Sequence, residues 1–227
     1  MCCELKIQDL GKIAYEDAFE VQLSLQKHVS DSRGDFQDPF HLLLLEHDPP
    51  VVTISKRPSA KKHLLATPQQ LADAGVVVCE TNRGGDITYH GPGQVVGYPI
   101  LDLENFFTDI HKYLRLLEET IILTLAEYGI KATRSDGETG VWLDVGTPFA
   151  RKICAMGVRA SRWVTMHGFA LNVNTDLGYF DNIIPCGIRG KAVTSLRVEL
   201  NLDRVDENQV KEKLLKHFLA LFEADLA

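Results

Sequence analysis

The sequence predicts a single α/β domain in which helices pack against a mixed, largely antiparallel sheet. Its 227 residues contain no Pro/Ser-rich linker, internal repeat or low-complexity tract, so one domain over 1–227 is expected. Four segments have apolar residues at helical spacing, with short β-branched or aromatic runs between them. Several of these runs, from 140 to 199, follow one another without a helix. Strict βαβ alternation is therefore absent, which favours a mixed or antiparallel sheet.

The expected helices cover 14–29, 67–75, 109–128 and the segment that follows Asp206. Each carries a stripe of apolar residues at a spacing of three or four. The second has the clearest ends, because Thr67 is a suitable N-cap, Gln70 closes a capping box and Gly75 is a typical stop.

The expected strands are short runs bounded by Gly, Pro, Asn or Asp. They are "FHLLLLE" (40–46), "PVVTI" (50–54), "VVVCE" (76–80), "VVGYPILDL" (95–103), "GVWLDV" (140–145), "KICAMGV" (152–158), "HGFALNV" (167–173) and "VTSLRVEL" (193–200). They supply the strands of the predicted sheet.

Composition limits the classes of protein. The chain is 45% hydrophobic and 24% charged, as in ordinary soluble globular proteins, and its net charge of −7 argues against binding to nucleic acid or an anionic membrane. Its five cysteines form no C-x-x-C pair, and an odd count does not fit a secreted disulfide framework. No signal-peptide pattern or bilayer-length apolar run is present. A cytoplasmic protein with reduced thiols is expected.

The stretch "RGGDITYHGPGQ", residues 83 to 94, is a candidate ligand-binding loop. Its glycines allow a ligand to approach the backbone closely, Arg83 adds a cation, and His90 and Gln94 add polar groups. The alternative is two ordinary turns around a short strand, "ITY". The chain has no G-x-x-x-x-G-K-[ST] motif, and this stretch is not G-x-G-x-x-G, so no nucleotide is implied.

Lys152 is unusual because it stands inside the otherwise apolar run "ARKICAMGV". If this run is a regular strand, Lys152, Cys154 and Met156 share one face, and Ile153 and Ala155 share the other. One interpretation is an edge lysine whose stem reaches out to water. The other is a partly buried amine that takes part in proton transfer.

Cys186 lies between Pro185 and Gly187 in "NIIPCGIRGKAVTSL", and this flanking predicts a turn. A cysteine there is a small apolar plug, a metal ligand, half of a disulfide or a nucleophile. Metal binding is disfavoured because no Cys/His cluster has zinc spacing. A nucleophile needs an exposed thiol and a cation close by to populate the thiolate, and a lysine brought near by the fold would serve.

Taken together, five stretches occur in a specific order: "RGGDITYHGPGQ", "TGVW" at 139–142, "RKICAMGVR" at 151–159, "RWVTMHGFALNVNTDL" at 162–177, and "IIPCGI" with "VTSL" at 183–196. This order closely resembles the lipoyl(octanoyl) transferases, which move an octanoyl group from acyl carrier protein to a lysine of a lipoyl domain. The resemblance extends from the first helix to about residue 200. It implies the α/β catalytic domain shared by biotin and lipoate ligases.

The resemblance implies that Cys186 is the nucleophile that carries the acyl group as a thioester. It implies that Lys152 lowers the pKa of this thiol and handles the proton. The implied substrate-binding residues are Arg83, Gly84, Gly85, Asp86, Ile87, Thr88, Tyr89 and His90; Ala155, Met156 and Gly157; and Gly168, Phe169 and Ala170. The chemistry of these residues agrees with that role, because glycines admit an acyl chain and offer N–H donors to an oxyanion, and Met156 and Phe169 are expected to supply an apolar wall.

The partners implied are octanoyl-acyl carrier protein as donor, and lipoyl domains of 2-oxoacid dehydrogenases or glycine cleavage H protein as acceptors. No cofactor or metal is expected. One departure concerns the loop after "HDPPVVTI", where the family usually has Gly-Arg and this chain has Ser55 and Lys56. Two alternatives remain: an ATP-dependent lipoate–protein ligase on the same fold, and a non-catalytic acyl- or carrier-protein-binding module. "HGPGQ" and the cysteine of "PCGI" favour the transferase.

Overall fold

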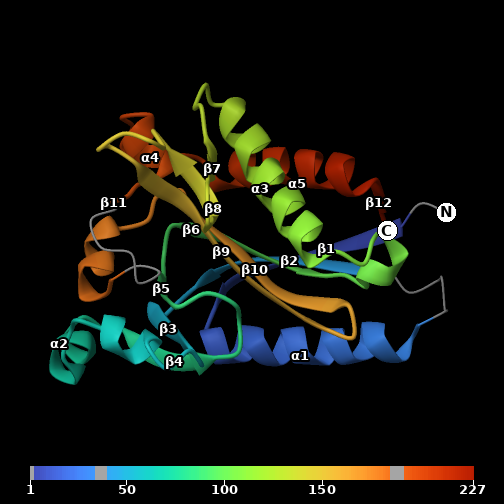
Figure 1. The fold of residues 1–227 in the computed structure, drawn as a ribbon, viewed down its shortest axis with the longest axis horizontal. Coiled ribbons are helices and arrows are strands. Elements are labelled where there is room, and N and C mark those ends of the chain that lie inside the picture. The colour runs from blue at the N-terminus through green and yellow to red at the C-terminus, as the bar shows by residue number, and fades with distance from the viewer. Residues whose placement is uncertain (1–2, 34–39, 185–191) are drawn as a thin grey trace.

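A computed structural model describes residues 3–33, 40–184 and 192–227 (Figure 1). Its larger sheet has the order β12 (Ala224–Leu226), β1 (Cys3–Ile13), β2 (Phe40–His47), β6 (Gln94–Ile100), β10 (Val164–Asn172), β9 (Arg151–Ser161), β8 (Glu138–Leu143) and β7 (Thr133–Ser135). The two-residue β11 (Ala192–Val193) runs parallel to β9. Pairs from β2 to β7 are antiparallel, whereas β1 is parallel to both neighbours. The expected mixed, largely antiparallel sheet is therefore confirmed.

A smaller sheet has the order β4 (Val77–Thr81), β3 (Val51–Ser55) and β5 (Ile87–His90). In Figure 1 it lies at the lower left, beside the start of α1 (Tyr15–Asp31). The short helix α2 (Pro68–Asp73) and the 3-10 turns Ala60–His63 and Leu177–Asn182 pack against it around an apolar cluster. The small sheet thus stands against one end of the large one.

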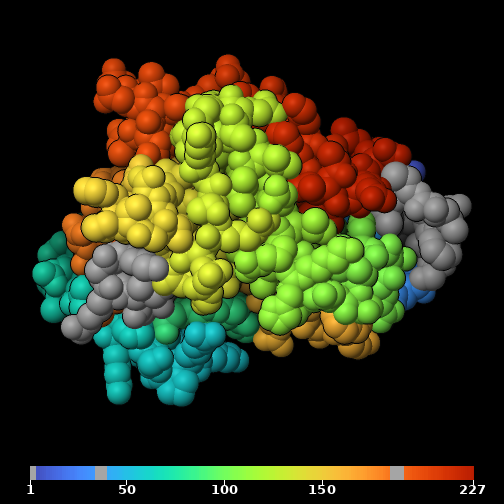
Figure 2. Space-filling model, turned by 45° about the horizontal axis from the view of Figure 1, so that its top comes forward, coloured from blue at the N-terminus to red at the C-terminus, as the bar shows by residue number. Residues whose placement is uncertain are grey.

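Helices cover both faces of the large sheet (Figure 1). Helix α1 lies on one face, where Ala18 and Val29 join clusters with residues of β2, β6 and β10. Helices α3 (Ile110–Ala126) and α5 (Glu207–Phe222) lie on the other face and enclose the main core. Seen from the side of α3 and α5, these two helices form much of the surface (Figure 2).

The four expected helices are all present, and local chemistry explains their starts. Thr67 and Gln70 form the predicted capping box at α2. The Asp109 carboxylate accepts from two backbone N–H groups at the start of α3, and Asp206 does the same for one at α5. No helix within the described residues is long and apolar enough to span a bilayer.

The expectation of a strand over 193–200 is wrong beyond its first residue. After β11 the chain enters the short helix α4 (Leu196–Glu199), because the Ser195 Oγ accepts from the Val198 N–H at 3.4 Å as an N-cap. Strand β1 was not predicted, and its side chains lack clear alternation in burial. A single domain over 1–227 stays a prediction.

Candidate active site

A β-bulge at Ile153 decides which way Lys152 faces. In the β8–β9 ladder Cys154 pairs with Val141, whereas Trp142 pairs with Lys152, so Ile153 is the extra residue. Ile153 and Cys154 therefore both join the core beneath α3. The prediction that Lys152 and Cys154 share a face is wrong, because a bulge interrupts the two-residue period.

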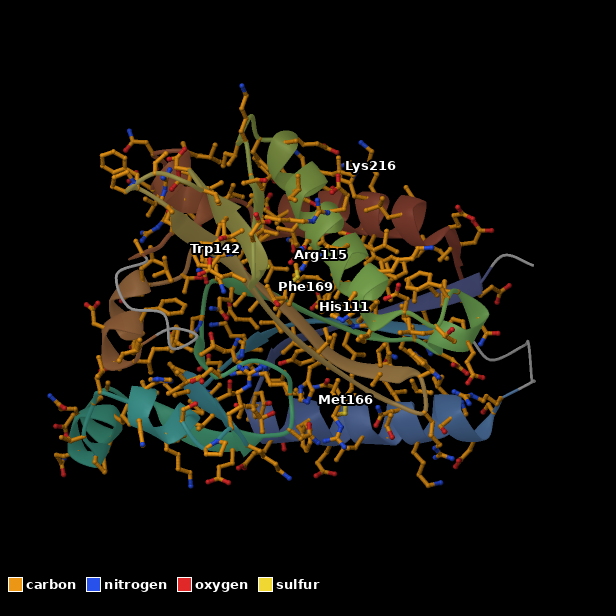
Figure 3. The ribbon with its side chains drawn as sticks, viewed as in Figure 1. His111, Arg115, Trp142, Met166, Phe169 and Lys216 are labelled. Carbon is orange, nitrogen blue, oxygen red and sulfur yellow. The ribbon has the colours of Figure 1, made fainter. Side chains whose placement is uncertain are left out.

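Lys152 consequently lies on the side of the sheet away from α3. Its cross-strand partner Trp142 stands between Val141 and Leu143, whose side chains point into the α3 core. Paired residues project to the same side, so Lys152 and Trp142 both project to the other. Trp142 of β8 is labelled in Figure 3.

The Lys152 side chain is buried, with 7% of the residue exposed. Its Nζ donates to the Thr139 carbonyl oxygen at 3.0 Å and lies 4.5 Å from the Trp142 ring centroid. This corresponds to a hydrogen bond and a cation–π contact. The interpretation of Lys152 as an edge lysine that extends into water is therefore wrong, and the amine is held in a defined place.

Two cysteines within the described residues, Cys79 and Cys154, have buried thiols. Cys154 is fully buried, and burial raises the pKa of its thiol, so it remains protonated and unreactive at neutral pH. Burial and the neighbouring Glu16 carboxylate raise the pKa of Cys79 as well. Cys186 lies outside the described residues. Its role as a nucleophile therefore stays a prediction.

A pocket that is partly open to solvent lies between the small sheet and strands β9 and β10. Most of the predicted substrate-binding residues line it, namely Arg83, Gly85, Asp86, Thr88, His90, Ala155, Met156, Gly157, Gly168, Phe169 and Ala170. Lys152 is not among its lining residues. It projects on the same side of β9 as Ala155 and Gly157, because alternation resumes after the bulge.

Three predicted residues do not line the pocket, and each has a local reason. Ile87 and Tyr89 alternate with Thr88 along β5, so their side chains enter the apolar cluster of the small sheet. The Gly84 N–H donates to the Val158 carbonyl at 3.1 Å and joins the loop to β9. These three residues thus adjoin lining residues of the pocket without lining it themselves.

Gly157 allows the loop to approach β9 closely. A Cβ at this position would lie 2.5 Å from the Gly84 carbonyl oxygen, which is closer than real Cβ contacts. The Arg83 side chain lies against the same position and fixes the loop by donating to the Thr53 carbonyl at 3.0 Å and to the Asp86 carbonyl at 3.3 Å. The two glycine-bearing stretches singled out by sequence are therefore in contact.

Alternation along β9 and β10 leaves small residues facing the pocket. Ala155 pairs with Ala170, and Gly157 pairs with Gly168. The Phe169 side chain points to the opposite side, where a Cβ at Gly97 would strike its ring, and packs in the main core (Figure 3). The expectation that this ring supplies an apolar wall of the pocket is therefore wrong, although Phe169 borders the pocket. This wall is therefore formed mostly by main chain and methyl groups, which suits an extended apolar ligand.

The sequence interpretation missed the aromatic residues at one end of the pocket, Tyr15, Tyr98 and His167. The Tyr98 hydroxyl is 2.7 Å from His47 Nε2, and His167 Nε2 is 2.7 Å from Asn82 Oδ1. They come from α1, β6 and β10, so no local motif contains them all. His167 directly precedes Gly168, a predicted substrate-binding residue, and this neighbour in the sequence was the one indication that His167 lies near the pocket.

The histidines of this end are neutral at pH 7. Burial lowers the pKa of His47 to about 4 and that of His167 to about 3. Burial and the adjacent His47 also hold the pKa of His90 well below its usual value. The two histidine rings that line the pocket, His90 and His167, are thus uncharged, which is compatible with an apolar chain.

This architecture, with its loop and strand motifs, defines the biotin/lipoate ligase-like class, and comparisons with known proteins agree. The family model described as "Lipoyl protein ligase A/B catalytic domain" matches residues 15–219. An octanoyltransferase from Flavobacterium johnsoniae is 62% identical over 230 residues, covering 98% of each chain. The chain belongs to the lipoyl protein ligase A/B catalytic-domain family and, within it, to the octanoyltransferases.

Solved structures support the fold. A lipoate-protein ligase A bound with ATP has a TM-score of 0.72 at 17% identity, over 100% of this chain and 88% of that chain. A biotin protein ligase from Aquifex aeolicus, in complex with biotin and ATP, has a TM-score of 0.55 at 14% identity, over 96% and 70%. At these identities the likeness concerns fold alone. The predicted biotin/lipoate ligase-like fold is confirmed.

Proposed function

We propose that this octanoyltransferase takes its octanoyl group from octanoyl-acyl carrier protein, holds it as a thioester on Cys186 and passes it to a lysine of a lipoyl domain. Octanoyl transfer in protein lipoylation follows from the family. The donor, the acceptors and the covalent route are the proposed parts. We propose lipoyl domains of 2-oxoacid dehydrogenases or glycine cleavage H protein as acceptors.

The observation that supports the route best is the orientation of Lys152. The bulge at Ile153 turns this amine to the pocket side of β9 and turns the Cys154 thiol into the core. An ammonium group near a thiol stabilises the thiolate, which is the reactive form. Lys152 would therefore activate a thiol on the pocket side, and Cys154 is on the wrong side to be that thiol.

The chemistry balances without a nucleotide. The Cys186 thiolate attacks the carbonyl of the donor thioester, and the carrier-protein thiol leaves with a proton, so one thioester replaces another. The acceptor amine then attacks the acyl-enzyme, an amide forms and the Cys186 thiol is regenerated. In the first step Lys152 would receive the Cys186 proton and deliver it to the leaving thiolate.

Incubation of the protein and a lipoyl domain with octanoyl-carrier protein or with free octanoate, each with and without ATP, tests this proposal against its alternatives. The transferase route gives octanoylated lipoyl domain without ATP. Product formed only from free octanoate and ATP would indicate a ligase. Donor binding without any product would indicate a non-catalytic module. Either of the last two outcomes would contradict the proposal.

We expect the size of Ala155 to control use of the octanoyl chain. Ala155 lies on the pocket side of β9, opposite Ala170, so leucine there would fill space needed by the chain. Ala155→Leu should lower kcat/KM for the octanoyl donor about tenfold, with a smaller loss for a butanoyl donor. The control Ala160→Leu changes the same strand outside the pocket. Equal losses for both donors would contradict steric control.

We propose that the donor docks on an exposed basic segment, 56–62, which contains Lys56, Arg57, Lys61 and Lys62. Acyl carrier proteins are acidic, and this chain carries a net charge of −7, so a local positive surface would offset repulsion. The segment includes the departure from the family loop: Ser55 Oγ accepts from the Arg57 N–H at 3.3 Å, and Lys56 is exposed. The cyan segment that includes these residues projects at the lower edge of Figure 2.

Reversing charge at Lys61 and Lys62 should slow association with the donor several-fold at low salt, because charged surfaces steer encounter. Lys61 pairs with Glu80 at 2.6 Å, but both side chains are more than half exposed, so the pair is weak. Reversal at Lys213 and Lys216, which pair with Glu127, is the matched control. Lys216 is labelled in Figure 3, away from the small sheet. Stopped-flow association measured against salt concentration checks this prediction. Equal association rates in both double variants would show that the 56–62 segment is not part of the docking surface for the donor.

A further inference from the structure

We propose that Glu118 is a positioning residue for Lys152 and acts through the single peptide group that joins Thr139 to Gly140. This inference rests on the proposed function, in which the Lys152 amine handles the Cys186 proton. Glu118 belongs to α3 and lies on the other side of the sheet from the pocket. The peptide group connects the two sides.

Two hydrogen bonds on this peptide group define the connection. The Lys152 Nζ donates to the Thr139 carbonyl oxygen at 3.0 Å. The Gly140 N–H of the same peptide donates to the Glu118 carboxylate at 3.0 Å. The Lys152 ammonium group is therefore connected to the Glu118 carboxylate through the carbonyl and the N–H of one peptide group. Hydrogen bonds in such a series polarise and strengthen one another.

Gly140 makes this arrangement possible. Its φ of +112° lies in the region that favours glycine, and a Cβ there would stand 2.5 Å from the Cys154 carbonyl oxygen. The same Cβ would lie 3.5 Å from Lys152 Cε. The peptide orientation, the β9 bulge and the lysine side chain therefore depend on one another.

The Glu118 carboxylate is buried but not isolated. None of its side chain is exposed, and its second oxygen accepts from Arg115 and from Arg134, each at 3.0 Å. Arg134 also binds Glu119 at 2.5 Å. Burial of a carboxylate is costly, and two arginines offset that cost. A purely structural role would be to join α3 to β7 through Arg134, and that role would not require the contact with Gly140.

The charged residues next to Lys152 and Thr139 in the sequence, Arg151 and Glu138, have partners of their own. Arg151 of β9 binds Glu199 of α4 at 2.6 Å and also contacts Asp144. Glu138 of β8 accepts from the Ser135 hydroxyl at 2.7 Å. Cys154, on the same strand as Lys152, is a buried neutral thiol. Glu118 is the carboxylate that meets the peptide holding Lys152.

Glu118→Gln tests this inference, because glutamine keeps the side-chain size and removes the charge. Glu119→Gln is the matched control, since it also removes a carboxylate from Arg134 but leaves the Gly140 contact intact. The readout is the ¹³Cε resonance of Lys152 in lysine-labelled protein, assigned by its loss in Lys152→Arg and followed against pH. Without the distant carboxylate the ammonium form is less favoured. The Lys152 titration midpoint should be lower in Glu118→Gln than in the unmodified protein and unchanged in Glu119→Gln.

Single-turnover acylation gives the functional counterpart. In Glu118→Gln the alkaline limb of the rate profile should move to lower pH by the same amount, while the dissociation constant for the donor stays unchanged. If Glu118→Gln fails to fold, Arg115→Gln replaces it, because Arg115 is half exposed. Arg115→Gln removes one of the two cations that offset the negative charge of Glu118, so the Lys152 titration midpoint should rise instead.

The outcomes separate the inference from the proposed function. An unchanged Lys152 midpoint in Glu118→Gln, or a fall in Arg115→Gln, would overturn the role of Glu118 and leave the Cys186 route intact. Absence of an acyl group on Cys186 in the unmodified protein would overturn the route, whereas the midpoint shift would still be observed. Equal shifts in Glu118→Gln and Glu119→Gln would show a general charge effect and overturn transmission through Gly140.

Discussion

Replacing Cys186 with serine is expected to abolish nearly all octanoyl transfer, with a loss on the order of a thousandfold or more. Serine preserves the size of the side chain, but a hydroxyl has almost no population of its anion at pH 7, whereas a thiol beside a cation does. Intact-mass measurement after addition of octanoyl-carrier protein without acceptor tests the intermediate directly. The unmodified protein should gain one octanoyl group, and Cys186→Ser should gain none.

Cys154→Ala is the control for this experiment. Cys154 is fully buried, lies on the α3 side of β9 and has a thiol pKa raised by burial. Removal of its sulfur should therefore leave acylation of Cys186 intact. An octanoyl group located on Cys154 by peptide mapping would contradict both the assignment of the nucleophile and the argument from strand direction.

Local sequence chemistry predicted the elements whose ends depend on near neighbours. The capping box of Thr67 and Gln70 and the N-cap Asp206 are short-range interactions, and they form as expected. The strand expected over 193–200 failed for the same kind of reason. Its β-branched residues suggested a strand, but Ser195 caps a helical turn, and this competing signal prevailed.

The direction of Lys152 was not predictable from strand periodicity. A regular strand would place it with Cys154 in the core, and the bulge at Ile153 reverses that outcome. Glycine within a strand pattern often accompanies a bulge, so Gly140 in "TGVW" was the available indication. The pairing shift itself depends on the register between β8 and β9, which neither segment determines alone.

The pocket was predicted where the sequence is contiguous and missed where it is not. The stretches 83–90, 155–157 and 168–170 came from continuous motifs, and most of their residues line the pocket. Alternation explains the exceptions Ile87 and Tyr89. The end formed by Tyr15, Tyr98 and His167 is assembled from three distant elements, so only the tertiary structure brings these rings together.

Lys152→Ala is expected to slow formation of the acyl-enzyme by about a hundredfold or more, since positioned proton transfer commonly contributes that much. Donor binding should change little, because the Lys152 amine contacts the Thr139 carbonyl and the Trp142 ring and does not line the pocket. Quenched single-turnover reactions from pH 6 to 9, analysed by intact mass, measure the rate. Donor affinity is measured separately with the Cys186→Ser background.

Lys152→Arg distinguishes charge from proton handling. Arginine preserves a positive charge that stabilises the thiolate, but its guanidinium stays protonated in this pH range and cannot accept the Cys186 proton. If Lys152 acts by charge alone, Lys152→Arg should recover most of the rate lost in Lys152→Ala. If proton transfer also matters, Lys152→Arg should remain slow while the Cys186 thiol still reacts readily with a small alkylating reagent. Acylation of Lys152→Ala at the unmodified rate across this pH range would exclude both roles and leave the buried amine as a purely structural partner of the Thr139 carbonyl.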